Sequence, residues 1–242
     1  MRIRTVLLGV IALLVVGVAA AFLILGQTPP PPAARAAQPQ GTVLLIPGYG
    51  GGAGELGRLE AELSERGIRD EVVDIGDGTG DLRTYAADID DRARTLMAAG
   101  QPAPDLVGFS AGGIIARIAA DGAPDLYRKV VTLGSPHNGT ATADAGALFG
   151  ECPMACQQMR TDSALLAELP VAKYPGDWLS VWSDTDSVIR PPDSSELTGV
   201  RGYRLQEFCP GTVEHGSIPG DPRTTAVVTA FLTGATLPTT CP

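Results

Sequence analysis

Short apolar runs alternate along this chain with segments in which apolar residues recur at helical spacing. Runs of about five residues rich in Val, Ile and Leu are typical of strands buried on both faces of a parallel sheet. Apolar residues three and four positions apart are typical of helices with one buried face. The predicted strands cover residues 42–46, 71–75, 105–109, 129–133, 178–183 and 202–206. The predicted helices cover residues 55–66, 84–99, 112–120 and 221–232.

Strands separated by helices predict an α/β fold with a mostly parallel central sheet and helices on both faces. Residues 140–177 interrupt the alternation and contain several short apolar pieces. We expect this segment to be an insertion over the carboxyl edge of the sheet, where insertions tend to shape the ligand site.

The first 26 residues have a different pattern. Arg2 and Arg4 precede an uninterrupted apolar run, Val6–Leu25, which is long enough to span a bilayer. Positive flanks are retained in the cytoplasm, so the rest of the chain is predicted to be exported. This pattern is typical both of a signal peptide, here cut after Ala34-Arg35-Ala36, and of a retained membrane anchor. We favour the anchor, because the run exceeds the usual apolar core of a signal peptide.

A Pro- and Ala-rich stretch, residues 27–40, is predicted to be a semi-rigid spacer. It leads into one globular domain, residues 41–242, which is large enough for a substantial core. The formal net charge of −9 and the lack of a basic run argue against nucleic-acid binding.

The chain has four cysteines, all in its C-terminal half, and an even number in an exported domain indicates disulfides. Three pairings are possible, and we favour Cys152–Cys156 with Cys209–Cys241. A zinc site is the alternative, but no Cys-x2-Cys pair is present and neither histidine completes a familiar zinc pattern. We therefore predict no metal.

Gly108-Phe109-Ser110-Ala111-Gly112 matches G-x-S-x-G, with an apolar strand before it and an apolar helix after it. A nucleophilic serine on a sharp strand-to-helix turn has a strained backbone and needs small neighbours two positions away. The glycines at both ends of the motif meet this need. Ser110 is therefore the candidate nucleophile, and an ordinary Gly-rich turn is the alternative interpretation.

A serine hydroxyl needs a base within hydrogen-bond reach, and the chain has two histidines. His215 follows all the predicted strands and precedes the last helix, which fits the order Ser, acid, His of this kind of site. His137 follows Ser110 by only 27 residues in a turn-rich stretch, so we expect it to fix a loop.

The acid is expected just after the strand 178–183, which leads into Asp184-Thr185-Asp186. Both carboxylates are eligible, and we favour Asp186 because Ser187-Val188-Ile189 could pack its turn. Asp177 and Asp193 are weaker candidates. The acid would hold the imidazole in the correct tautomer.

The oxyanion of an acyl transfer needs N–H donors. The N–H of Ala111 and the N–H of Tyr49, in the Gly-rich loop after the first strand, are the expected donors. A phosphate cradle is the alternative for this loop, but the Lys-Ser/Thr ending of a P-loop is absent.

These motifs resemble those of bacterial triacylglycerol lipases and esterases of the α/β-hydrolase superfamily, above all the secreted actinobacterial group. The resemblance rests on Pro47-Gly48-Tyr49-Gly50, residues 108–113, residues 132–140 and the Asp186/His215 arrangement. It implies the α/β-hydrolase fold, a Ser110–Asp186–His215 triad, an acyl-enzyme intermediate and no organic cofactor. Residues 152–159 are similar to a short disulfide-closed segment of those enzymes, which supports the Cys152–Cys156 pairing.

The resulting hypothesis is an exported serine ester hydrolase that acts on lipid or acyl esters. An acyltransferase or thioesterase would use the same residues, because water and an alcohol can both accept the acyl group. A non-catalytic, surface-anchored binding domain is a further alternative.

Overall fold

The computed structural model describes residues 39–170 and 177–242. The predicted N-terminal anchor or signal peptide, residues 1–26, and the spacer up to residue 38 lie outside the described residues. Within the described ranges, no helix is both long enough and apolar enough to cross a bilayer.

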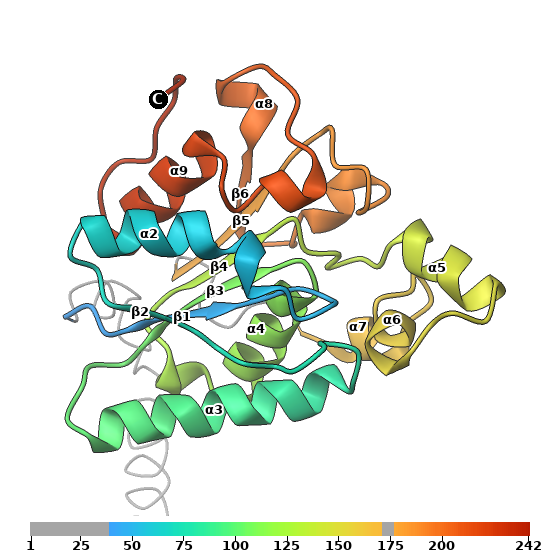
Figure 1. Cartoon of the computed structure of the whole chain (residues 1–242), viewed down its shortest axis with the longest axis horizontal. Helices are drawn as coiled ribbons and strands as arrows, with labels where there is room; N and C mark the ends of the chain where they lie inside the picture. Colours follow the sequence, from blue (N-terminus) through green and yellow to red (C-terminus); the bar gives the residue numbers. More distant parts are fainter. Residues whose placement is uncertain (1–38, 171–176) are drawn as a thin grey trace, which may run out of the picture. The chain divides into compact units, whose positions relative to one another are not determined.

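A six-stranded sheet with strand order β2-β1-β3-β4-β5-β6 forms the centre of the domain, and every neighbouring pair is parallel (Figure 1). The predicted parallel sheet is therefore confirmed. Its strands are β1 (Val43–Ile46), β2 (Asp70–Val72), β3 (Asp105–Phe109), β4 (Val130–Leu133), β5 (Trp178–Trp182) and β6 (Arg201–Arg204).

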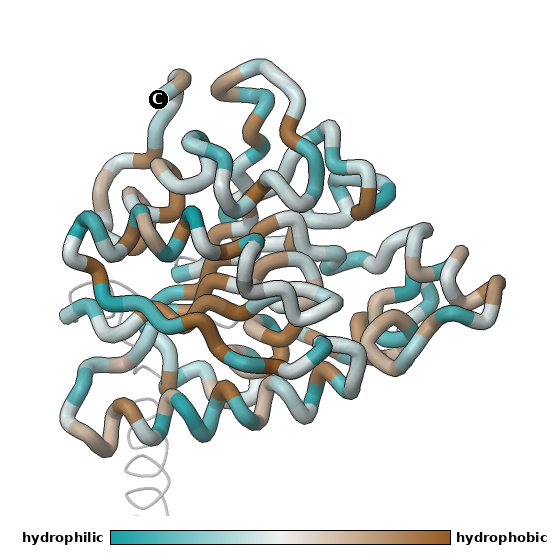
Figure 2. Tube along the Cα trace, in the orientation of Figure 1, coloured by the Kyte–Doolittle hydropathy of each residue, from teal (hydrophilic) through white to brown (hydrophobic). Residues whose placement is uncertain are grey.

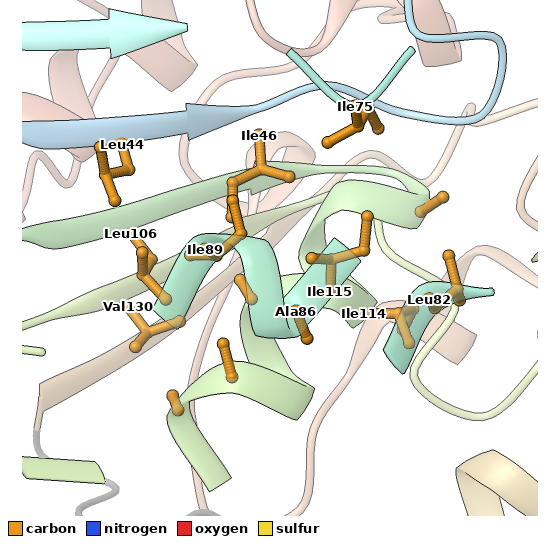
Figure 3. Packing of buried hydrophobic residues seen from close by; sticks show 14 of the residues in the cluster. Leu44, Ile46, Ile75, Leu82, Ala86, Ile89, Leu106, Ile114, Ile115 and Val130 are labelled. Carbon is orange, nitrogen blue, oxygen red and sulfur yellow. The ribbon is translucent and has the colours of Figure 1, made fainter. Parts of the chain in front are cut away.

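Helices cover both faces of the sheet because successive strand residues point to opposite sides. Leu44 and Ile46 of β1 pack toward α3 (Leu82–Ala98) and α4 (Ala111–Gly122), as Figure 3 shows. Val43 and Leu45 of the same strand pack in a second cluster with α2 (Gly57–Glu65) and α9 (Pro222–Thr233). The central strands are accordingly the most hydrophobic part of the chain trace, whereas polar residues recur along α2 and α3 (Figure 2).

The predicted strand 71–75 is too long at its C-terminal end. β2 stops at Val72, and the side chain of Asp74 accepts a hydrogen bond from the Gly76 N–H at 2.8 Å. This local bond belongs to a turn, and turns of this kind compete with strand pairing. The predicted strand 202–206 is also wrong at its end, because Leu205 already begins α8 (Leu205–Phe208) and is fully buried.

The predicted insertion contains three short helices, α5 (Ala141–Leu148), α6 (Met154–Gln158) and α7 (Ala164–Glu168). They project beyond one end of the sheet, next to the loops that follow the strands (Figure 1). The remaining short elements are 3-10 turns, η2 (Ala53–Glu55), η3 (Pro124–Leu126), η5 (Pro192–Ser195) and η6 (His215–Ser217).

Disulfides join Cys152 to Cys156 and Cys209 to Cys241, the pairing favoured from the sequence. The first closes the start of α6, and the second ties the end of α8 to the C-terminus. All four sulfurs are therefore occupied, so the cysteines are not available as zinc ligands.

Candidate active site

Ser110 lies between the end of β3 and the start of α4 with φ 53° and ψ −121°. Among the residues that the structure describes, it is the only non-glycine residue with positive φ. Such a conformation costs free energy and persists only where the surroundings impose it. A Cβ on Gly108 would lie 2.3 Å from the Gly112 oxygen, and a Cβ on Gly112 would lie 2.2 Å from the Ile46 oxygen. The turn therefore needs glycine at both ends of the motif.

His215 lies in η6, and its imidazole connects Ser110 to Asp186. Its Nε2 is 3.0 Å from Ser110 Oγ, and its Nδ1 is 2.7 Å from Asp186 Oδ2. The ring also packs against Phe109, with 4.8 Å between the ring centroids. The structure thus brings together three segments that are distant in the sequence.

The carboxylate of Asp186 is almost completely buried, with 1% of its side chain exposed. Its Oδ1 accepts hydrogen bonds from the N–H groups of Val188 and Ile189, both at 2.8 Å. Its other oxygen is thereby left to the imidazole. A buried carboxylate held in this way fixes both the orientation and the tautomer of a histidine.

Asp184, the alternative acid, is not bonded to His215. Its side chain is 43% exposed, and Oδ2 is 3.8 Å from Nε of Arg204. Asp177 and Asp193 are not hydrogen-bonded to His215 either, because its Nδ1 bonds to Asp186 and its Nε2 to Ser110.

His137 is fully buried and lies in a separate network. Its Nε2 is 2.9 Å from Thr132 Oγ1, and its carbonyl accepts a hydrogen bond from Arg117 at 3.2 Å. Burial and the nearby Arg117 charge lower the pKa of His137 to about 3. It is therefore neutral at physiological pH and holds the loop after β4.

The two expected oxyanion donors belong to segments that adjoin Ser110. Ala111 is the first residue of α4, so its N–H has no acceptor within the helix. The loop that carries Tyr49 approaches from β1, and a Cβ on Gly48 would lie 3.0 Å from Ser110 Cβ.

A cavity of about 270 Å³ opens beside Ser110, and its lining is mostly apolar. Its walls come from the Tyr49 loop, the segment that contains α5 and α6, and the turn after Asp186. The lining residues are Tyr49, Ser110, Thr140, Thr142, Ala143, Gly146, Glu151, Cys156, Met159, Val188 and Ile189.

Glu55 is a charged neighbour of His215 that the sequence analysis missed. Its Oε1 lies 3.6 Å from the position of a Cβ on Gly216. Partial burial raises the pKa of its carboxyl, and the charge of His215 opposes that shift. No motif signals this residue, because η2 and η6 meet only in the folded chain. Within the described residues, no group of three or more His, Cys, Asp or Glu side chains is placed to hold a metal ion.

The sheet order, the helices on both faces and the serine turn after β3 define the α/β-hydrolase fold, and comparison with solved structures confirms it. A lipase of Bacillus licheniformis in its mature form matches with a TM-score of 0.63 and 14% identity, over 79% of this chain and 91% of that one. Lipase B of Aspergillus fumigatus matches with a TM-score of 0.69 and 16% identity, over 83% of this chain and 54% of that one.

A structure reported for the metagenome-derived lipolytic enzymes LipS and LipT matches with a TM-score of 0.64 and 18% identity. It covers 81% of this chain and 96% of that one. No known family's sequence profile matches the chain. At these identities the likeness shows the fold, and the narrower resemblance to secreted actinobacterial lipases stays a prediction.

Proposed function

We propose that this protein is a serine carboxylic-ester hydrolase with Ser110 as nucleophile, His215 as general base and Asp186 as the acid that orients the imidazole. The observation that carries the proposal is the continuous hydrogen-bonded chain from Asp186 through His215 to Ser110 Oγ, beside an apolar cavity. An activated serine of this kind needs both a base in reach and a group that orients the base.

In the proposed reaction, Ser110 Oγ attacks the ester carbonyl carbon while its proton moves to His215 Nε2. The carbonyl π electrons become a negative charge on oxygen, which the N–H groups of Tyr49 and Ala111 stabilise. When that electron pair returns, the bond to the alcohol oxygen breaks, and the proton on Nε2 passes to the leaving group. Water then attacks the acyl-enzyme by the same steps and regenerates Ser110.

The substrate class is proposed to be esters of apolar acyl groups, including lipids. The cavity next to Ser110 offers the acyl group a mostly apolar lining. The segment that supplies part of the cavity lining also has three exposed apolar side chains, those of Leu148, Phe149 and Met154. Large apolar side chains left exposed on such a segment are typical of a surface that contacts apolar material.

We also propose that the domain works outside the cytoplasm, either secreted or anchored to the outer face of the membrane. Two disulfides favour an oxidising compartment. Arg2, Arg4 and the run Val6–Leu25 supply the export signal in this proposal. Fractionation of cells that express the full chain, with a thiol-labelling assay of each fraction, tests it. Recovery of a reduced domain from the cytoplasm alone would refute it.

Replacing Ser110 tests the catalytic proposal. We expect Ser110→Ala to lower kcat for a dissolved chromogenic ester on the order of 10⁶-fold while leaving the circular dichroism spectrum unchanged. Ser64→Ala is the matched control, because Ser64 is an exposed serine that hydrogen-bonds to Asp70 on the surface. A fluorophosphonate probe should label the wild type and the control but not Ser110→Ala. Undiminished turnover by Ser110→Ala would overturn the assignment.

A further inference from the structure

Two glycine-rich turns touch each other through their backbones near Ser110. One is the segment 48–51 after β1, and the other is the segment 76–80 after β2. A Cβ on Gly78 would lie 2.8 Å from the oxygen of Gly48 and 3.2 Å from the nitrogen of Gly51. In the opposite direction, a Cβ on Gly51 would lie 1.8 Å from the oxygen of Gly76. No side chain fits between the two turns.

The segment 76–80 is itself firmly held. The side chain of Asp77 accepts hydrogen bonds from the N–H and the hydroxyl of Thr79, at 3.0 Å and 2.9 Å. The carbonyl of Thr79 accepts a hydrogen bond from the N–H of Ala155 in α6 at 3.0 Å. The N–H of Gly80 donates to the hydroxyl of Tyr85 in α3 at 2.9 Å. This turn is therefore fixed to two helices and cannot easily give way.

On its other side, the segment 48–51 faces the serine turn, since a Cβ on Gly48 would meet Ser110 Cβ at 3.0 Å. The segment that carries the Tyr49 N–H is thus held between Ser110 and the segment 76–80. A donor contributes to an oxyanion site only when it is held at the correct distance before the reaction, and displacements of about 1 Å can cost 10²-fold in rate.

We infer that Gly78 is a positioning residue for the proposed ester hydrolysis: its lack of a side chain lets the segment 76–80 hold the Tyr49 N–H in place beside Ser110. This inference rests on the proposed function. It concerns the transition state, because the N–H is needed for the charge that develops on the carbonyl oxygen and not for binding of the neutral ester.

The pair Gly78→Ala and Gly76→Ala tests the inference. Both glycines have nearly the same backbone, with φ of +63° and +61°, so alanine introduces similar strain at either position. A Cβ on Gly76 meets nothing within 4 Å, whereas a Cβ on Gly78 meets the segment 48–51. We expect Gly78→Ala to lower kcat about 10- to 100-fold with KM changed less than about threefold. Gly76→Ala should stay within about threefold of the wild type in both constants.

Hydrogen exchange provides a readout that does not depend on turnover. Amides in residues 48–52 should exchange faster in Gly78→Ala than in Gly76→Ala, because the displaced segment loses its support. Equal kcat and equal exchange in the two variants would overturn the inference. If the wild type hydrolyses no ester, or Ser110→Ala retains activity, the proposed function is wrong. That outcome does not depend on Gly78, because both of these proteins keep the glycine. Exchange in residues 48–52 then decides alone whether Gly78 supports this segment.

A second pair of variants covers the case in which Gly78→Ala does not fold. The side chain of Asp77 lies on the surface, so Asp77→Ala should fold while it loosens the turn. We expect Asp77→Ala to lower kcat several-fold and Asp77→Asn to restore it, because the amide oxygen can still accept from Thr79. Full activity in Asp77→Ala with unchanged exchange in residues 48–52 would also count against the inference.

Discussion

At the scale of single residues, the site depends on groups that are restrained on every side. Ser110 keeps a positive φ because the strand before it and the helix after it fix the turn. Asp186 is restrained by two backbone N–H groups, which leave one oxygen for His215. Restraint of this kind keeps the donors and acceptors of an active site in place before the substrate arrives.

The two aspartates after β5 allow a matched test. We expect Asp186→Asn to lower kcat about 10⁴-fold while the fold is kept, because the amide no longer accepts the Nδ1–H and favours the wrong tautomer. Asp184→Asn should retain kcat within about twofold, because Asp184 makes only a partly exposed ion pair with Arg204. Steady-state kinetics on a dissolved ester measures both. A larger loss in Asp184→Asn than in Asp186→Asn would reverse their roles.

The hydrogen bonds around His137 show which of its ring nitrogens carries the proton. The hydroxyl of Ser180 donates to the Ser195 carbonyl at 2.6 Å, and the hydroxyl of Thr132 donates to Ser180 at 3.2 Å. Thr132 has only one hydroxyl proton, so its oxygen must accept from the Nε2–H of His137. The buried imidazole is therefore neutral with its proton on Nε2.

This buried histidine predicts a pH dependence of stability. Burial lowers the pKa of His137 to about 3, whereas an unfolded histidine titrates near its ordinary value of 6.5. As the pH falls below 6.5, the unfolded chain binds a proton that the folded protein does not, so the free energy of unfolding falls by up to about 1.4 kcal/mol per pH unit. His137→Gln keeps a donor for Thr132 and removes this titration, so its stability should fall less steeply between pH 6.5 and 4.5.

Urea unfolding of both proteins at several pH values measures the two slopes. Carboxyl groups also make stability depend on pH, but His137→Gln keeps all of them. The difference between the two slopes therefore measures the contribution of His137 alone. Parallel slopes would contradict the prediction.

At the scale of elements, the parallel sheet brings the segments of the candidate active site together. β3 and β5 both border β4, and their carboxyl ends lie at the same edge. The turn after β3 carries Ser110, and the loop after β5 carries Asp186. The insertion that contains α5, α6 and α7 then supplies much of the cavity wall. This is the general place for ligand sites in open α/β sheets.

The exposed apolar residues at the end of α5 predict that the rate of ester hydrolysis depends on whether the substrate is emulsified or dissolved. Leu148 and Phe149 are 81% and 78% exposed, so their apolar area is available to an emulsion surface. We expect Leu148→Ser/Phe149→Ser to lower turnover of an emulsified long-chain ester at least about tenfold, because burial of each side chain is worth about 1.5–3 kcal/mol. Turnover of a dissolved short-chain ester should not change.

Met97→Ser is the control, since Met97 is an exposed apolar residue in the last turn of α3, at the end of that helix away from the insertion (Figure 1). It should leave both activities intact. An equal loss on both substrates in Leu148→Ser/Phe149→Ser would show that the tip of α5 serves the cavity and not the surface.

At the scale of the whole domain, the two disulfides close loops of very different length, with sequence separations of 4 and 32. In the chain-entropy model, the longer loop constrains the unfolded chain more. The Cys209–Cys241 bond also holds the C-terminus, a position that otherwise tends to fray.

Removal of the Cys209–Cys241 disulfide should therefore lower the free energy of unfolding more than removal of the Cys152–Cys156 disulfide. We expect Cys209→Ser/Cys241→Ser to lower the free energy of unfolding by about 4 kcal/mol, and Cys152→Ser/Cys156→Ser to lower it by about 2 kcal/mol. Urea unfolding at neutral pH, followed by tryptophan fluorescence, measures both. The reverse order would mean that the bonds act mainly through the folded state.

The elements of the central sheet were predictable because their apolar patterns are local. Residues 105–109 form β3 as predicted, and α9 begins as expected, with the side chain of Asp221 accepting from the N–H of Arg223. The ends of β2 and β6 were not predictable from the same pattern. Leu205 is buried as it would be in a strand, and whether it continues β6 or begins α8 depends on packing against the second apolar cluster.

By itself, the sequence determined the strand–turn–helix around Ser110, because apolar periodicity and backbone sterics act over a few neighbouring residues. Only the tertiary structure decided that His215, 105 residues away, reaches Ser110, and that Asp186 and not Asp184 reaches His215. The tertiary structure also brought Gly78 against the segment that carries Tyr49. Such contacts depend on the packing of whole elements, and no local pattern records which distant segments that packing joins.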